Sequence, residues 1–268
     1  MNLLFSYLFW LSLISIFVLF LERIFPARPH RVNGVLKDWF YLFFNGEIFG
    51  VCLAYSLMFI GGHIVWPDSL RSLNLLDGWP WLMQVLVFFV FKDFVDWWVH
   101  RLLHRYDFLW RWHRFHHTAT EMDFLICFRF HWMETILYRT GGWLVLLICG
   151  MDFTAIFVCA VLSTLIGHLN HANLNFGYGW LGYIVNNPRF HIWHHELRSQ
   201  GEVVCNFAIN LSLWDYLFRT AYRDDTRTPI LGIDDSPDTS CKLNGEPSLP
   251  GIIFFVLFWF WVILWYSH

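Results

Sequence analysis

The sequence predicts an all-α integral membrane protein: a helical bundle of about four spanning helices plus a re-entrant helical hairpin, with a cytoplasmic helical cap that holds a histidine cluster. Three observations lead to this prediction. Hydrophobic residues make up 57% of the 268 residues and charged residues only 15%, against about 25% charged in an ordinary soluble domain. The apolar residues form runs long enough to cross a bilayer core of about 30 Å. The 14 histidines are nearly as many as the 18 lysines and arginines together, which calls for a chemical explanation.

The composition also excludes several classes of protein. A disordered chain or a disulfide-framework mini-protein would not carry so much apolar surface with so little charge. A net charge of −3 offers no basic surface for phosphates, so we expect no nucleic-acid partner. The six cysteines are scattered, without a C-x-x-C pair, and we interpret them as small apolar core residues.

The first two apolar runs are expected to be membrane helices. Residues 3–21 contain no charge and are long enough to span. No basic segment precedes them and no small-residue cleavage site follows, so they are predicted to be a helix rather than a signal peptide. Residues 40–66 form a second run that is long enough to tilt or kink.

Three further apolar regions complete the bundle. Residues 79–99 form a third spanning helix with charged residues at its far end. Residues 141–167 are interrupted by Gly150-Met151-Asp152, and the first half is too short to span. We therefore expect a re-entrant helical hairpin or one bent helix there. The last run, residues 250–266, lies near the end of the sequence.

The placement of lysine and arginine predicts the orientation. Basic residues gather in residues 22–38, 92–140 and 170–248, whereas the segment between the second and third runs holds only Arg71. Cytoplasmic loops carry the excess of basic residues, so these three segments are expected on the cytoplasmic side. The N-terminus then starts outside, and residues 141–167 enter the bilayer and return.

Eleven of the 14 histidines fall between residues 100 and 195, on the expected cytoplasmic side. Most of them are three or four residues apart, so on a helix they share a face. The groups are His100 and His104 (H-x-x-x-H), His113, His116 and His117 (H-x-x-H-H), the isolated His131, His168 and His171 (H-x-x-H), and His191, His194 and His195 (H-x-x-H-H).

Metal coordination explains these spacings. Neutral imidazole is a good ligand for zinc, iron and copper, and paired histidines direct two nitrogens at one point. One ion needs about four to six ligands, so nine to eleven imidazoles suffice for two ions. Without a metal such clustering would be costly. The alternative interpretation is a hydrogen-bonded core or interface histidine; we prefer it for His30, His63 and His268, and both interpretations stay open for His131.

The order of these motifs resembles the fatty acid hydroxylase / sterol desaturase superfamily. The segments that have counterparts there, in the same order, are DWWVHRLLHRYDFLWRWHRFHH, FRFHWME, GHLNHANL, NPRFHIWHHE and NFAINLSLWDYLFRT. They cover roughly residues 85–222, about half of the chain. The resemblance implies a non-haem di-iron centre held by the eight histidines of the three boxes, with His168 and His171 as additional ligands. Zinc is a possible substitute for iron in a purified sample.

Three positions depart from the pattern of that family. Trp132 stands where the family often has proline, and Ala208 and Arg219 stand where it often has glycine. The departures leave the metal ligands untouched. They are expected to alter only the cap or the loop over the site.

Two carboxylates are candidate catalytic residues through contact with the ligands. Ligand histidines usually donate their other N–H to a carboxylate or a carbonyl. Asp96 lies one turn before His100 on the same helix face, so we expect it in this role; its alternative interpretation is a helix-end charge that reaches water. Glu134 is the second candidate. Weaker candidates are Glu196, Asp215 and Asn187.

Four parts of the chain follow from the runs and the resemblance. They are N-terminal transmembrane helices in residues 1–78, a fatty acid hydroxylase/sterol desaturase-like catalytic domain in 79–222, a polar loop in 223–249 and a C-terminal transmembrane helix in 250–268.

The resemblance implies an oxygenase that hydroxylates or desaturates a C–H bond of a sterol, fatty acyl or related lipid with O2. The sequence has no C-x-x-C-H haem motif, dinucleotide fingerprint or ferredoxin-like cysteine set, so the electrons must come from an external donor, such as a cytochrome b5-like protein, a ferredoxin or a reductase. A multi-pass protein of a bacterial inner membrane or of the endoplasmic reticulum is expected. Hydroxylation and desaturation stay alternatives, because both begin with the same hydrogen abstraction.

Two other functions remain alternatives. A membrane zinc hydrolase would also use histidines, but a catalytic zinc takes about three protein ligands, and the sequence has no H-E-x-x-H. A histidine-rich haem-binding or metal-binding redox protein, or a metal transporter, would need polar groups within the bilayer's depth. Metal analysis distinguishes the three: about two irons per chain for the oxygenase, one zinc for the hydrolase, and haem absorbance for the electron carrier.

Overall fold

The computed structural model describes residues 6–31, 34–63, 75–149, 151, 153–197 and 204–233. Within these ranges every regular element is helical, and the only β-type pairing is an isolated bridge between Glu196 and Leu231. The predicted all-α class is therefore confirmed for the part of the chain that the structure describes. The last apolar run and residues 150 and 152 of the predicted interruption lie outside the described residues.

Ten elements carry the architecture. They are α1 (Tyr7–Ile24), α2 (Val35–Phe43), a π-helical turn (Phe44–Ile48), α3 (Phe49–His63), α5 (Trp81–Arg105), α6 (Asp107–His117), α7 (Trp132–Cys149), α8 (Phe153–His171), α9 (Pro188–His191) and α10 (Leu213–Leu217). Two 3₁₀ turns, Phe124–Phe128 and Gly179–Tyr183, join them. The third apolar run continues as one helix through His100 and His104, as their spacing on a shared face predicts, so that α5 carries both histidines.

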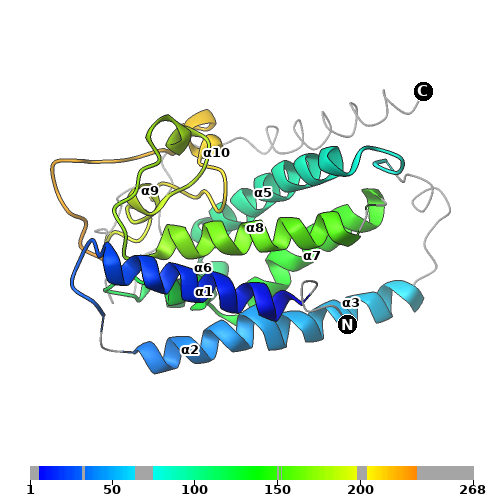
Figure 1. Cartoon of the computed structure of the whole chain (residues 1–268), viewed down its shortest axis with the longest axis horizontal. Helices are drawn as coiled ribbons and strands as arrows, with labels where there is room; N and C mark the ends of the chain where they lie inside the picture. Colours follow the sequence, from blue (N-terminus) through cyan, green and yellow to red (C-terminus); the bar gives the residue numbers. More distant parts are fainter. Residues whose placement is uncertain are drawn as a thin grey trace.

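The long helices run together and the short ones gather at one end. Figure 1 shows α1, α5 and α8 along the long axis of the molecule, with α9 and α10 at the end on the left. Helix α8 packs against both α1 and α5, and α7 packs against α5. Helix α9 packs against α8 as well, and α6 follows α5 directly and packs back on it. This end of the bundle therefore brings together four histidine-bearing helices.

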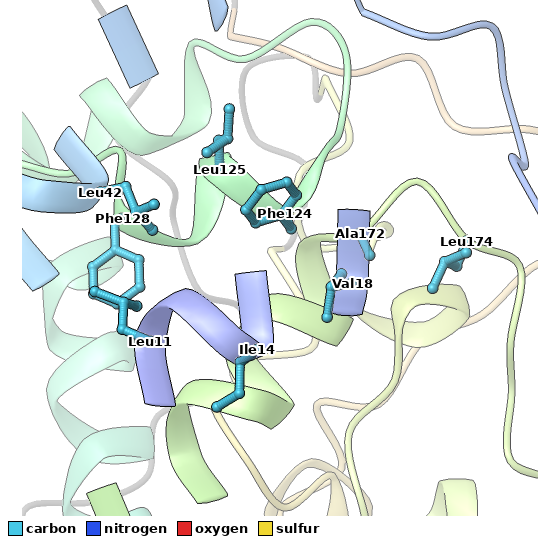
Figure 2. Close-up of a cluster of buried hydrophobic side chains, with 9 residues drawn as sticks. All are labelled: Leu11, Ile14, Val18, Leu42, Phe124, Leu125, Phe128, Ala172 and Leu174. Carbon is cyan, nitrogen blue, oxygen red and sulfur yellow. The ribbon is translucent and has the colours of Figure 1, made fainter. Parts of the chain in front are cut away.

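One apolar cluster fixes α1 on the bundle. The cluster, drawn in Figure 2, joins α1 to α2, to the 3₁₀ turn and to the segment after α8. Its members are Leu11, Ile14, Val18, Leu42, Phe124, Leu125, Phe128, Ala172 and Leu174. The three residues from α1 are spaced three and four apart and so lie on one face of the helix. Side chains on another face of α1, such as Ile16 and Phe20, are exposed.

A buried ionic network ties α2 to the turn that precedes α7. Arg31 contacts Asp38 of α2 at 2.7 Å and Asp123 at 2.9 Å, and its side chain is 4% exposed. Asp123 also accepts a hydrogen bond from the backbone N–H of Leu125 at 3.0 Å, which starts the 3₁₀ turn. Buried charges of this kind are stable only when they are paired, so the network fixes the position of both elements.

Two described helices are long and apolar enough to cross a membrane, Tyr7–Ile24 and Thr154–His171. Helix α5 is longer, with 25 residues. It carries Lys92, Asp93 and Asp96 in its second half, and exposed apolar side chains such as Leu82 and Leu86 in its first half.

Candidate metal centre

Nine buried histidines form two groups at the end of the bundle where α5, α6 and α8 meet α9. In each group the available ligand atoms lie within 4.8 Å of one another. The five-histidine group consists of His100, His104, His113, His117 and His194, and the four-histidine group of His116, His171, His191 and His195. The groups are adjacent, since the rings of His117 and His195 stack with their centroids 4.6 Å apart. The structure thus brings together nine of the eleven histidines that the sequence singles out.

Each H-x-x-H-H box serves both groups. In α6, His113 and His117 are four residues apart and join the five-histidine group, whereas His116 joins the other group. The second box has the reverse arrangement: His191 and His195 enter the four-histidine group, and the remaining histidine of the box enters the first. In α6, residues four apart share a helix face while consecutive residues point about 100° apart, which is why the first box reaches both groups. In the second box His191 ends α9, and the other two histidines lie in the turn that follows.

Local sequence starts the helix that carries the second box. Asn187 accepts a hydrogen bond from the backbone N–H of Phe190 at 3.1 Å and so caps α9, and Pro188 occupies the first helical position. Both residue types are favourable at these positions. Asn187, a weaker candidate for contact with the ligands, therefore has a defined role in orienting His191.

Backbone carbonyls fix the tautomers of two histidines in the five-histidine group. The Nδ1 of His100 lies 2.8 Å from the carbonyl oxygen of Phe207, and the Nδ1 of His194 lies 2.8 Å from that of Cys205. A carbonyl oxygen only accepts, so Nδ1 must donate in both contacts. The Nε2 atom of each ring is therefore unprotonated and directed into the group.

Glu134 has the same effect on a third ligand. Its Oε2 accepts from the Nδ1 of His113 at 2.8 Å, and both side chains are buried. In the four-histidine group, the carbonyl oxygen of Gly167 accepts from the Nδ1 of His171 at 2.8 Å. These partners leave Nε2 as the free lone pair of both rings.

The Nε2 atoms within each group face one another. The Nε2 atoms of His100 and His113 are 3.0 Å apart, and those of His191 and His171 are 3.1 Å apart. With Nδ1 carrying the proton, His100 and His113 present two lone pairs to each other, which repel unless a cation binds both. Two nitrogens that each lie about 2.1 Å from one ion, at a right angle, are about 3 Å apart. The donor set therefore fits bound metal.

His195 gives a second indication of the same kind. Its ring is fully buried, and neither of its nitrogens has a hydrogen-bond partner in the described part of the chain. A buried polar atom without a partner costs about 1–3 kcal/mol. Coordination of an ion by one ring nitrogen removes part of that cost.

Five of the buried histidines, His116 and His117 of α6 and the three of the second box, are neutral at pH 7. Burial lowers the pKa of His116, His117, His191, His194 and His195 well below the ordinary value, and the neighbouring imidazoles lower it further. A metal binds the neutral ring, so these side chains are ready to act as ligands without first losing a proton.

The two candidate carboxylates have different surroundings. Glu134 contacts the ligand His113, as described above. Asp96 is ion-paired with Lys92, one turn earlier in α5. Glu196, one of the weaker candidates, is ion-paired with Arg227 near the surface.

Two of the predicted ligands lie outside both groups. His168 is fully buried one turn before His171; its Nδ1 donates to the carbonyl oxygen of Thr164 at 2.9 Å, and its Nε2 accepts from the hydroxyl of Ser15 at 3.1 Å. His131 is half-buried, and its ring stacks on Trp112 with centroids 6.1 Å apart.

Side-chain patterns alone missed the carbonyls of Cys205 and Phe207, because any residue type supplies a backbone carbonyl. The segment NFAINLSLWDYLFRT that contains Phe207 was the available signal, since it follows the second box in the family pattern.

Comparison with known proteins places these residues in context. A family model described as fatty acid hydroxylase matches residues 85–220. Ornithine lipid hydroxylase OlsE of Rhizobium tropici is 31% identical over 156 residues, which are 58% of this chain and 44% of that protein. Alkylglycerol monooxygenase of Caenorhabditis elegans is 26% identical over 71% of this chain and 41% of that protein. Methylsterol monooxygenase 1-1 of Arabidopsis thaliana is 24% identical over 80% of this chain and 73% of that protein.

The chain thus spans less than half the length of the first two of these relatives. No solved structure matches it. The resemblance seen in the motifs is confirmed, because the matched residues contain all three histidine boxes.

Proposed function

The chain belongs to the fatty acid hydroxylase family, and from this premise we propose that it is a membrane-bound di-iron oxygenase that hydroxylates or desaturates a lipid C–H bond with O2 and external electrons. One observation carries the proposal: the Nε2 atoms of buried imidazoles converge at 3.0–3.2 Å in two adjacent groups. When bound there, two iron ions would supply O2 activation and hydrogen abstraction from an unactivated C–H bond.

The number of imidazoles bears on the choice between iron and zinc. Nine imidazoles exceed the three protein ligands of a catalytic zinc, so the alternative of a zinc hydrolase is less favoured.

The residues around the groups orient the ligands. We propose that Glu134 holds the ring of His113 and raises the basicity of its Nε2, as carboxylates do for ligand histidines. Asp96 stays a proposed carboxylate of the site, one turn before His100. His131 and His168 stay predictions as ligands, and their contacts in this structure are to other partners.

The membrane arrangement is proposed to include four spanning helices: α1, the continuous stretch from α2 to α3, α5 and residues 250–268. Helices α7 and α8 would form the re-entrant hairpin, and residues 79–222 the catalytic domain. The exposed apolar side chains of α1 and of the first half of α5 support contact with lipid. The histidine groups lie where α5 and α8 end, so an acyl or sterol carbon can reach them from the bilayer at its cytoplasmic boundary.

The proposal implies three partners: a lipid substrate from the bilayer, O2 and an external electron donor. The names of the relatives include a lipid hydroxylase and two monooxygenases, which supports the lipid substrate. A bacterial inner membrane and the endoplasmic reticulum both fit the proposed topology.

Lipid profiling tests the function. Cells that express the intact protein should accumulate a lipid with one added oxygen or one added double bond, whereas cells that express His113→Ala should not. The purified protein should contain about two irons per chain. Lipid changes that are identical for the intact protein and the variant would contradict the proposal, and one zinc per chain would favour the hydrolase.

A further inference from the structure

A short segment without regular structure, residues 205–208, lies against the five-histidine group; we call it the strap. Two of its carbonyl oxygens, those of Cys205 and Phe207, accept hydrogen bonds from the Nδ1 atoms of His194 and His100. The strap therefore sets the tautomer of two of the five histidines.

Asp215 of α10 holds the strap. Its side chain is fully buried and accepts hydrogen bonds from the backbone N–H groups of Phe207, at 3.0 Å, and Ala208, at 2.8 Å. It also accepts from the indole N–H of Trp97 at 3.0 Å and from the hydroxyl of Thr220 at 2.6 Å. Four donors satisfy the carboxylate, as burial of a charge requires.

Asn206, between the two carbonyls, anchors the strap to its surroundings. Its φ of 58° lies in the left-handed region, which asparagine tolerates better than most residues. Its side-chain amide donates to the carbonyl oxygens of Phe190 in α9, at 2.7 Å, and of Tyr222, at 2.8 Å. The strap is thus tied to the helix that begins the second histidine box.

We propose that Asp215 is a positioning residue for the five-histidine group. Asp215 accepts from the backbone N–H groups of Phe207 and Ala208, which flank the carbonyl group of Phe207. That carbonyl in turn orients the ring of His100 and holds its Nδ1 proton. A carboxylate outside the ligand set thereby controls one metal-binding nitrogen through the backbone. The inference rests on the proposed function in one respect, that the five-histidine group binds metal.

Asp93 of α5 provides a matched control, because it binds the backbone of the same loop. It is buried and accepts from two consecutive backbone N–H groups, those of Asn210 and Leu211, and from the indole N–H of Trp214. The carbonyl oxygen of Asn210, however, accepts from the backbone N–H of Asn186 rather than from a histidine. Asp93 therefore resembles Asp215 in burial and in donors but holds a part of the loop whose carbonyl contacts no histidine of the five-histidine group.

Titration with cobalt(II) tests the inference. The full chain in detergent, freed of metal with a chelator and kept without oxygen, is titrated with cobalt(II) alone, and the visible absorption of each equivalent is recorded. Asp215→Asn should weaken the binding of one of two equivalents by about 10–100-fold and shift its absorption bands. Asp93→Asn should leave affinity and bands unchanged. In a His100→Ala background, Asp215→Asn should add no further shift.

The outcomes separate the inference from the proposed function. If the unaltered chain binds fewer than two cobalt ions, the two-metal proposal and the inference both fail. If it binds two, and Asp215→Asn titrates like the unaltered chain or Asp93→Asn changes the bands equally, only the inference is overturned. Should Asp215→Asn not fold, Thr220→Val, which removes one donor to the carboxylate at similar volume, decides: a smaller shift of the same bands supports the inference, and identical bands overturn it.

Discussion

Glu134, in the first turn of α7, accepts a hydrogen bond from the Nδ1 of His113 in α6 at 2.8 Å, and both side chains are 2–3% exposed. The contact joins two helices at the metal centre and leaves the Nε2 of His113 free, 3.0 Å from that of His100 and 3.1 Å from that of His117. The carboxylate thus orients His113, whose Nε2 lies close to the Nε2 atoms of two other candidate ligands.

Replacement of this carboxylate should weaken metal binding. Glu134→Gln keeps the shape but removes the charge that raises the basicity of His113, so we expect iron affinity or activity to fall about 10–100-fold. Iron content after dialysis and product formation measure the effect. Asp96→Asn is the comparison: it removes the partner of Lys92, and an equal or larger loss of iron in that variant would assign the main role to Asp96.

Removal of metal should make stability depend on pH. The pKa values of His116, His117, His191, His194 and His195 are lowered in the folded chain by burial, so the unfolded chain binds more protons below its ordinary pKa of about 6.5. The metal-free protein should therefore keep its stability above about pH 6.5 and lose it as the pH falls further. Thermal midpoints at pH 5.5 and 8 measure this, and equal midpoints would contradict it.

Metal content should distinguish the two histidines near the end of α8. Both ring nitrogens of His168 have hydrogen-bond partners, whereas the Nε2 of His171 faces His116 and His191. We expect His168→Gln to retain about two irons with a lower thermal midpoint, and His171→Gln to lose iron. Loss of iron in His168→Gln would instead assign that residue to the ligands, as the family resemblance implies.

Loss of the buried ionic network should unfold the protein more easily. Arg31→Ala removes the close cationic partner of Asp38 and Asp123 and leaves Asp38 with Arg129 at 3.7 Å, at a cost of up to about 3–5 kcal/mol. Arg223→Ala removes the exposed pair with Asp225 and should cost about 0–1 kcal/mol. Thermal or denaturant unfolding of both variants measures the difference, and a similar loss in the two would mean that the network contributes little.

The sequence predicted the features that depend on local spacing. The four-residue separation of His100 and His104 places both in one group because α5 continues through them. The same rule describes an H-x-x-H-H box less well. His113, His116 and His117 share a broad face, but adjacent positions differ by about 100°. Only the folded structure, in which His116 faces His171 of α8, shows that the box divides between two groups.

Contacts between residues far apart in the sequence could not be predicted, for a different reason. Asp96 shares a helix face with His100, yet Lys92, four residues earlier, is an oppositely charged partner on the same face. Glu134 is 21 residues from His113 along the chain. Its contact depends on the turn between α6 and α7, which no spacing rule gives. The acceptors of the strap are backbone carbonyls, which every residue has, so the residue types at these positions do not reveal them.

The division of the boxes has a mechanical consequence. His116 and His117 are consecutive, as are His194 and His195, and in both pairs the two rings belong to different groups. Two peptide bonds therefore link the groups directly. A displacement of the histidines in one group is expected to displace those in the other. The folded chain would therefore hold two bound ions at one fixed separation.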